Sequence, residues 1–358
     1  MTEREAMARA LALAWQGWGR VHPNPMVGAV VLARGGAVVG EGWHAEFGGT
    51  HAEPMALAAA GTKARGATLV VSLEPCAHGG KQPPCVDAIL KAGVRRVVAA
   101  LPDPNPVAAG GAARLRAVGV DVTFGALAEE AARQNAAFLH TLRDSTRPYV
   151  SLKLAASLDG RIADRDGRSR WVSGPEAREW VQWLRAGMDA VAVGAETARK
   201  DDPSLTARGS VHPRVPPRRI VFTRSHAVPA TLSLIRTARE VPTMVAATTD
   251  AAARAAKPLE RHGVEVVRGS TLAATLTALG SAGITNLLVE GGGKLAGALL
   301  QENLVDRIYW IQSPMLLGEH GVAAVAGLSG KALARTDRWT VAGRRALGQD
   351  TLTVLDRR

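Results

Sequence analysis

The sequence predicts an α/β protein of two domains, and three observations lead to this expectation. The chain has 358 residues, which is long for one hydrophobic core and is better divided between two. In both halves, short β-rich segments alternate with helical ones, as in domains whose sheets are covered by helices. A short polar stretch that ends in proline, residues 144–148, separates the halves. We therefore expect one domain over residues 1–145 and another over residues 146–358.

The first half has the element order of a three-layer domain. An alanine-rich helix is expected over Thr2–Trp18, ended by His22-Pro23-Asn24-Pro25, and Gly35-Gly36 is the turn of a hairpin. Strands are expected at Val27–Leu32, Val38–Gly42, Thr68–Leu73, Val94–Ala100 and Val120–Phe124. Helices are expected at His51–Ala60, Val86–Ala92, Ala112–Ala117 and Ala126–Arg143.

One histidine and two cysteines carry the clearest chemical signal. His51 and Cys85 stand at the N-termini of predicted helices, and Cys76 follows a predicted strand, so the three side chains are expected to meet. Zinc takes such ligands in a tetrahedron, and a catalytic site leaves the fourth position open to water. Glu53, two residues after His51, is a carboxylate placed to carry protons for that water. This is the arrangement of zinc-dependent deaminases, which attack an amino-bearing ring carbon.

Two other interpretations of these residues stay open. A structural zinc site would need a fourth ligand, and His78, two residues after Cys76, is the one candidate. The cysteines could also be two unrelated buried residues, although they are the only two in the chain and both lie beside prolines in one segment. With both on a metal, none remains for a disulfide, which fits a reducing cytosol.

Composition narrows the classes of partner. A net charge of +12 fits nucleic acid, phosphorylated small molecules or a generally basic surface. Aromatic residues are only 4% of the chain and do not interleave with the arginines, which argues against nucleic acid. Residues 1–15 are charged, unlike a signal peptide, and no apolar run approaches the length of a membrane span. We expect a cytoplasmic protein with no membrane or nucleic-acid partner.

The second half predicts a mostly parallel sheet. Its β-rich segments are Tyr149–Leu154, Val191–Gly194, Arg219–Thr223, Thr243–Ala247, Val264–Val267 and Asn286–Glu290. The last of these leads through Gly291-Gly292-Gly293-Lys294 into a predicted helix over Leu295–Leu300. Glycines let a phosphate approach backbone amides, and a helix N-terminus favours an anion. On these residues alone, a tight turn without a ligand is the better interpretation.

Several motifs together resemble the RibD family of bifunctional riboflavin-biosynthesis deaminase/reductases. Eight residues separate Cys76 from Cys85, whereas other nucleobase deaminases commonly have two. The motifs of the first half are His22-Pro23-Asn24-Pro25-Met26-Val27-Gly28, Gly42-Trp43-His44, His51-Ala52-Glu53 and Leu73-Glu74-Pro75-Cys76 through Cys85. Those of the second half are Ala155 to Ala163, Ser169-Arg170-Trp171-Val172-Ser173, Asp201 to Arg208 and Val289-Glu290-Gly291-Gly292-Gly293.

The resemblance runs from about Glu3 to Leu355 and departs from the family in two places. Pro54 stands where a small aliphatic residue is expected, and the loop after Pro106 is one residue short. Neither departure touches a zinc ligand or Glu53.

The resemblance implies a cytidine-deaminase-like first domain with one zinc ion and a dihydrofolate-reductase-like second domain that uses NADPH. It implies deaminase substrate contacts from Asn24, His44, Lys81, Asp103 and Asn105, although turn formation is an equal alternative for Asp103 and Asn105. Cofactor contacts are implied for Ala155, Trp171, Thr197, Asp201, Gly291, Gly292, Gly293 and Lys294. Reductase substrate contacts are implied for Lys153, Ser169, Arg185, Leu205, Arg208 and Glu290, with the two arginines on the substrate phosphate.

The expected function is therefore bifunctional. The first domain would deaminate 2,5-diamino-6-ribosylamino-4(3H)-pyrimidinone 5′-phosphate, a phosphorylated pyrimidine. The second would use NADPH to reduce the ribosyl group of 5-amino-6-(5-phosphoribosylamino)uracil to ribityl, in a dimer or tetramer formed through this domain. Two alternatives remain: a nucleic-acid base deaminase with a C-terminal recognition module, whose RNA affinity would fall steeply with salt, and an inactive zinc protein.

Overall fold

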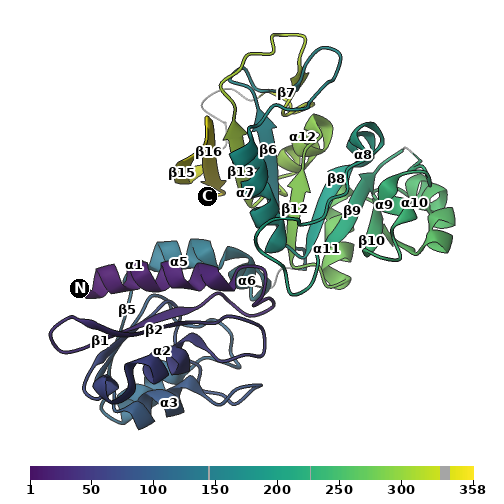
Figure 1. Ribbon diagram of the computed structural model, residues 1–358. Coiled ribbons are helices and arrows are strands. Elements are labelled where there is room, and N and C mark those ends of the chain that lie inside the picture. The colour runs from purple at the N-terminus through teal and green to yellow at the C-terminus, as the bar shows by residue number, and fades with distance from the viewer. Residues whose placement is uncertain (144–145, 226, 331–338) are drawn as a thin grey trace. The chain divides into compact units, whose positions relative to one another are not determined.

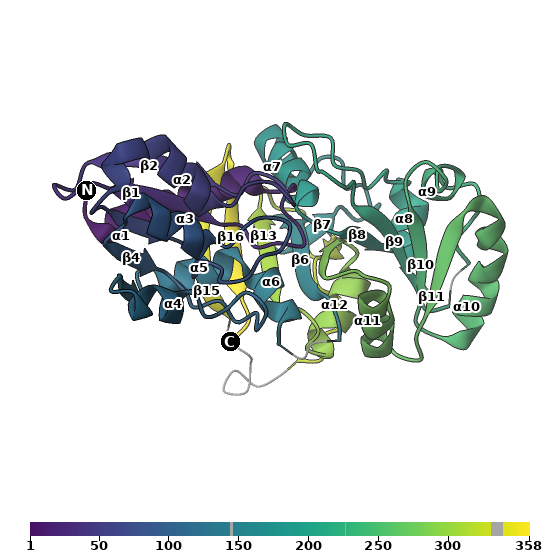
Figure 2. The same ribbon diagram turned by 90° about the horizontal axis from the view of Figure 1, so that it is seen from below.

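Figures 1 and 2 show the computed structural model of the chain, which describes residues 1–143, 146–225, 227–330 and 339–358. The chain divides into two units, Met1–Asp144 and Ser145–Arg358, each with its own sheet. The sequence places the division in residues 144–148, of which 144 and 145 lie outside the described residues.

The first unit is built on a sheet with the strand order β2-β1-β3-β4-β5. β1 pairs antiparallel with β2 and β3, whereas β3, β4 and β5 run parallel. The strands are β1 (Gly28–Leu32), β2 (Val38–Trp43), β3 (Thr68–Val71), β4 (Arg96–Ala99) and β5 (Asp121–Phe124).

Helices cover both faces of this sheet, as the three-layer prediction requires (Figure 1). α1 and α5 pack against one face, and α2, α3 and α4 pack against the other. Every residue of β1 is buried because both of its faces are covered. The helices are α1 (Glu3–Ala14), α2 (Ala52–Ala60), α3 (Cys85–Ala92), α4 (Gly111–Ala117), α5 (Ala128–Gln134) and α6 (Ala136–Thr141).

α1 begins where the sequence predicts and ends earlier. The Thr2 hydroxyl accepts from the backbone N–H of Glu5, and the Glu5 carboxylate accepts from that of Thr2, which forms a capping box. The prediction extends the helix to Trp18, but after Ala14 the chain tightens into a 3₁₀ turn over Trp15–Gly17. Such turns commonly end α-helices.

The predicted helix over Ala126–Arg143 is wrong as one element, because Asn135 divides it into α5 and α6. Asn135 is buried, and its side chain bonds the backbone of Met26 in both directions. The Met26 N–H donates to Oδ1 at 2.8 Å, and Nδ2 donates to the Met26 carbonyl at 2.9 Å. These two hydrogen bonds hold Asn135 against the segment after Asn24, at the point where α5 ends and α6 begins.

α2 lies directly on β2 because Gly42 has no side chain. A Cβ at Gly42 would stand 2.5 Å from the carbonyl oxygen of Ala52 and 2.5 Å from the amide nitrogen of Ala56, closer than real contacts allow. The glycine therefore lets β2 meet the first turn of α2. That turn carries Glu53 and follows His51.

The second unit has a mostly parallel sheet, as predicted, with the order β11-β10-β9-β8-β12-β6-β13-β16-β15. Among the described strands of this sheet, β16 pairs antiparallel with both β13 and β15, and the other neighbours pair parallel. The strands are β6 (Tyr149–Ala156), β8 (Ala190–Gly194), β9 (Arg218–Thr223), β10 (Thr243–Ala247), β11 (Val264–Arg268), β12 (Asn286–Glu290), β13 (Arg307–Gln312), β15 (Thr340–Leu347) and β16 (Asp350–Asp356). β7 (Arg161–Ala163) and β14 (Val322–Ala323) form a separate antiparallel pair.

The main core of this unit joins α11 and α12 to the central strands. The helices of the second unit are α7 (Pro175–Ala186), α8 (Ala195–Asp201), α9 (Ser233–Arg236), α10 (Asp250–Ala256), α11 (Leu272–Ser281) and α12 (Gly293–Gln301). None of the helices in the described part of the chain is long and apolar enough to cross a membrane.

Candidate active sites

His51, Cys76 and Cys85 meet at the ends of three elements, as the sequence predicts. His51 is the N-cap of α2, Cys76 lies in the loop after β3, and Cys85 is the first residue of α3. Nδ1 of His51 is 3.2 Å from Sγ of Cys85 and 3.7 Å from Sγ of Cys76. A zinc tetrahedron with bonds of about 2.0 to 2.3 Å holds such donors about 3.6 Å apart. The three residues fit a zinc ion.

The same geometry decides among the alternatives. Donor atoms that all lie within 4.8 Å of one another are not those of two unrelated cysteines. His78, the candidate fourth ligand, lines the adjoining pocket, but in the described part of the chain the ligand cluster holds only the other three residues. Three ligands beside an open pocket are typical of catalytic zinc.

The two thiols are poised to hold a cation. A hydrogen bond from the Cys85 thiol lowers the pKa of Cys76 to about 4, and the backbone N–H of Cys85 also donates to Sγ of Cys76 at 3.4 Å. The same shared proton raises the pKa of Cys85. The pair therefore holds one proton, and Cys76 is the thiolate. A metal cation at this point favours loss of that remaining proton.

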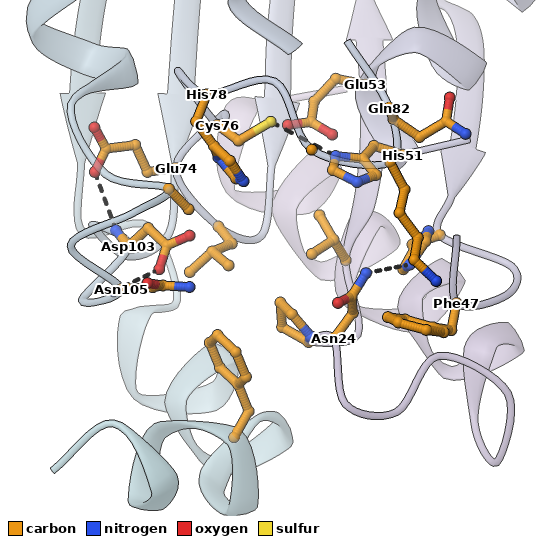
Figure 3. Close-up of a pocket in the computed structure, with 18 of the residues that line it drawn as sticks. Asn24, Phe47, His51, Glu53, Glu74, Cys76, His78, Gln82, Asp103 and Asn105 are labelled. Carbon is orange, nitrogen blue, oxygen red and sulfur yellow. Dashed lines mark hydrogen bonds between the residues drawn. The ribbon is translucent and has the colours of Figure 1, made fainter. Parts of the chain in front are cut away.

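Glu53 is the second residue of α2 and is only 4% exposed. Burial raises its pKa to about 7, against a hydrogen bond from its own backbone N–H. Figure 3 shows its carboxylate beside Cys76 and His51. A carboxyl with a pKa near neutrality can accept a proton and return it within one reaction cycle. Pro54 follows in the first turn, where a backbone N–H has no helical acceptor to lose.

A pocket of about 230 Å³ opens on this cluster, and all five residues assigned to the deaminase substrate line it. Asp103 and Asn105 also make the turn contacts that were the alternative for them. Oδ1 of Asp103 accepts from the Asn105 N–H at 2.9 Å, and Oδ1 of Asn105 accepts from the Val107 N–H at 3.1 Å. Asp103 and Asn105 therefore both form the turn and line the pocket. The other lining residues assigned from the sequence are Asn24, His44 and Lys81.

Two residues that organise this pocket, Phe47 and Glu74, were not assigned to it from the sequence. The ammonium of Lys81 lies 4.0 Å from the centre of the Phe47 ring, a cation–π contact. The buried carboxylate of Glu74 accepts from the backbone N–H of Asp103 at 3.0 Å and from that of Ala112 at 2.8 Å. Glu74 thus fixes the Asp103 loop beside the zinc ligands. Its place two residues before Cys76 was the available signal, because a charged residue at the end of a buried strand needs partners.

The second unit contains a larger cavity of about 900 Å³. Every residue that the sequence analysis assigned to the cofactor or to the reductase substrate lines it. These are Lys153, Ala155, Ser169, Trp171, Arg185, Thr197, Asp201, Leu205, Arg208, Glu290, Gly291, Gly292, Gly293 and Lys294. The structure brings them to one place from five strands and helices and the loops between them.

Glu290 is the centre of a buried ion cluster in this cavity. Its carboxylate contacts Arg185 at 2.5 and 3.1 Å and the Lys153 ammonium at 3.8 Å. Burial alone would raise the pKa of Glu290, but the two cations hold it below its usual value. Burial lowers the pKa of Lys153. Because Arg185 also donates to the carbonyl of Thr206, its guanidinium is already committed, whereas Arg208 contacts Ser204 at the surface.

The glycine turn has the form expected of an anion site. Gly291 and Gly292 both have positive φ angles, 68° and 82°, and α12 begins at Gly293. A Cβ at Gly292 would lie 2.8 Å from the hydroxyl of Thr197, so the turn and α8 meet here. Trp171 is 65% exposed, and the Arg178 guanidinium lies 4.5 Å from its ring centre.

A three-ligand zinc site with a buried proton carrier in one α/β unit, and a glycine turn at a helix N-terminus in the other, define the class of two-domain deaminase and reductase. Comparison with known families agrees. Residues 1–101 match the cytidine and deoxycytidylate deaminase zinc-binding region, and residues 148–353 match the RibD C-terminal domain. The chain belongs to the RibD family.

Relatives and solved structures support this membership over the whole chain. The riboflavin biosynthesis protein RibD of Aquifex aeolicus is 42% identical over 320 residues, with 88% of each chain covered. That of Escherichia coli is 41% identical, with 92% of each covered. Acinetobacter baumannii RibD has a TM-score of 0.83 at 35% identity, and a Thermotoga maritima deaminase/reductase has 0.83 at 33%, each covering 99% of both chains. The expected cofactors, zinc in the first unit and NADPH in the second, follow with the family.

Proposed function

We propose that the first unit deaminates 2,5-diamino-6-ribosylamino-4(3H)-pyrimidinone 5′-phosphate and that the second reduces the ribosyl group of 5-amino-6-(5-phosphoribosylamino)uracil to ribityl. Residues 1–145 form the deaminase domain and residues 146–358 the reductase domain. The observation that carries the proposal is the cluster of His51, Cys76 and Cys85 with buried Glu53 at the head of a pocket. The Thermotoga maritima protein of the same fold is described as having these two activities.

In the deaminase unit, a zinc ion held by the three ligands would supply an activated water. Glu53 takes the proton of that water and delivers it to the leaving ammonia, which its raised pKa supports. Asn24, Asp103 and Asn105 surround the ring, and Lys81 stands at the rim with the charge to meet the substrate phosphate.

In the reductase unit, NADPH would supply hydride to C1′ of the sugar. The N-terminus of α12 with Gly291 to Lys294 offers backbone N–H groups to the cofactor diphosphate. Arg208, the less committed arginine, receives the substrate phosphate. Lys153, held by Glu290, is the proton donor to the sugar, because a lowered pKa makes its ammonium a stronger acid.

The proposal includes the setting in which the enzyme works. Its partners are phosphorylated small molecules and not nucleic acid, it is cytoplasmic, and copies assemble through the reductase unit. The open edge strand β15, with Val341 46% exposed, is a surface that suits assembly. Sedimentation velocity of the purified protein tests the assembly.

The test of function is NADPH oxidation by zinc-loaded protein given the diaminopyrimidinone phosphate, beside Glu53→Gln. Wild type is expected to release ammonia and oxidise NADPH, and the variant to oxidise NADPH only when supplied with deaminated substrate. Ammonia release without NADPH oxidation would remove the reductase assignment. If Glu53→Gln changes neither activity nor product, the zinc site is structural. Salt-dependent RNA binding with neither activity would favour the base-deaminase alternative.

A further inference from the structure

His44 lines the deaminase pocket, but both of its ring nitrogens are already bonded. Nδ1 lies 3.1 Å from the carbonyl oxygen of Thr50, and Nε2 lies 3.1 Å from Nδ2 of Asn24. The residue is 3% exposed, and its backbone N–H donates to the carbonyl of Val27. His44 therefore has no polar ring atom left to offer a ligand.

The partners fix which ring nitrogen carries the proton. A backbone carbonyl only accepts hydrogen bonds, so Nδ1 of His44 must donate to Thr50. The amide nitrogen Nδ2 of Asn24, which only donates hydrogen bonds, lies 3.1 Å from Nε2 of His44, so Nε2 is the accepting nitrogen of the ring.

The same reasoning fixes the side-chain amide of Asn24. Only its NH₂ group can satisfy an accepting Nε2, so Oδ1 must lie on the other side of the amide. In Figure 3 the nitrogen of Asn24 lies on the hydrogen bond and the oxygen lies on the side of the pocket that faces Asn105.

We propose that His44 is a positioning residue that holds Asn24 with its amide oxygen toward the ligand, so that the pocket selects a ring edge carrying an N–H donor. This inference deepens the proposed deaminase function and rests on it for the identity of the substrate. The 4(3H)-pyrimidinone ring has such donors at N3 and at its amino groups. It replaces the expectation that His44 itself contacts the substrate.

Two substitutions separate the bonds of His44. In His44→Gln, the terminal group of the side chain stands near the place of Nε2 and can offer Asn24 an acceptor. In His44→Asn, the shorter amide can reach Thr50 but not Asn24. Both variants lose the ring that packs against His51, with centroids 5.2 Å apart, so that loss cancels in the comparison. Both are compared at equal zinc content.

The kinetic experiment is a double-mutant cycle on ammonia release. We expect His44→Asn to lower kcat/KM about 10-fold and His44→Gln to stay within about 3-fold of wild type, as for loss of one hydrogen bond to a buried polar group. Because His44 acts through Asn24, adding His44→Asn to Asn24→Ala should cause no further loss. Additive losses in the double variant, or equal losses in His44→Asn and His44→Gln, would overturn the proposal.

A second measurement does not depend on activity. ¹⁵N NMR of the histidine rings in the zinc-loaded full chain, with His44 identified by the spectrum of His44→Gln, should show a protonated Nδ1 and a bare Nε2. The opposite tautomer refutes the positioning role even in an active enzyme. If the wild type releases no ammonia, the proposed substrate is wrong, and the tautomer still decides the orientation of Asn24.

Discussion

The two candidate sites are built on opposite plans. The deaminase pocket of about 230 Å³ has its metal ligands at the N-cap of one helix, the first residue of another and the loop after one strand, between residues 51 and 85. The reductase cavity of about 900 Å³ draws on residues from 153 to 326 and is lined by an exposed tryptophan. The first plan fixes a few atoms closely with short-range contacts. The second needs many elements to be placed at once, so its chemistry depends more on the fold as a whole.

The largest expected effect tests whether deamination depends on the three zinc ligands alone. Cys85→Ser removes a soft ligand and should abolish zinc binding and lower deamination on the order of 1,000-fold, because the activated water is lost. The reductase cavity shares no residue with this site, so reduction of deaminated substrate should be unchanged. Zinc content by mass spectrometry and the two separate assays decide the point. A parallel loss of reduction would show that the sites are not independent.

The next effect tests the second plan at its charged centre. Glu290→Gln leaves the ammonium and guanidinium of Lys153 and Arg185 buried without their carboxylate. We expect a loss of about 3 kcal/mol in the free energy of unfolding of this unit, together with loss of reduction. Urea unfolding followed by a probe in the second unit measures it.

The matched control is Asp250→Asn, which removes a carboxylate from an exposed pair with Arg268 and should cost well under about 1 kcal/mol. If the two variants unfold alike, the Glu290 cluster does not stabilise the unit.

A smaller effect concerns the pH dependence of reduction. A proton donor works while it is protonated, and burial lowers the pKa of Lys153 from its ordinary 10.5. The rate should therefore fall as pH rises, with a midpoint below that value. In Lys153→Arg the rate should be lower but should no longer fall as pH rises through this range, since arginine stays protonated. If the rate of Lys153→Arg falls with rising pH at the same midpoint as that of the wild type, the titrating group is not Lys153.

The smallest effect lies at the rim of the deaminase pocket. Phe47→Leu removes the ring beneath Lys81 and should raise KM for the phosphorylated substrate about 2- to 5-fold with kcat unchanged. Phe47→Tyr keeps the aromatic face and should behave like wild type. The dephosphorylated nucleoside serves as the control ligand, since it makes no use of Lys81. An equal rise in KM for the nucleoside would show that Phe47 shapes the pocket and does not place the charge.

The sequence was most informative where chemistry depends on a few spaced residues. The positions of His51, Cys76 and Cys85 predict their meeting, because helix starts and strand ends converge at a sheet edge. The break at Asn135 was not predictable, since its cause is a bond to Met26, far away in the chain. The pairing of Arg185 with Glu290 was missed for the same reason. The C-terminal hairpin of β15 and β16 is local, and it was missed because β15, with half of its residues exposed, lacks a regular alternation of buried and exposed positions. Contacts across long sequence separations leave little local pattern.

The hydrogen bonds between Asn135 and Met26 bear on the minimum length of chain that can form a complete deaminase site. The recognised zinc-binding region ends at residue 101, yet Asp103, Asn105 and Phe138 form part of the pocket wall. Phe138 stands on α6, which the Asn135 amide anchors to the motif that carries Asn24. A deaminase trimmed to residues 1–101 would retain the three metal ligands in its sequence but lose one side of the substrate pocket. The shortest useful module extends through Thr141, the end of α6.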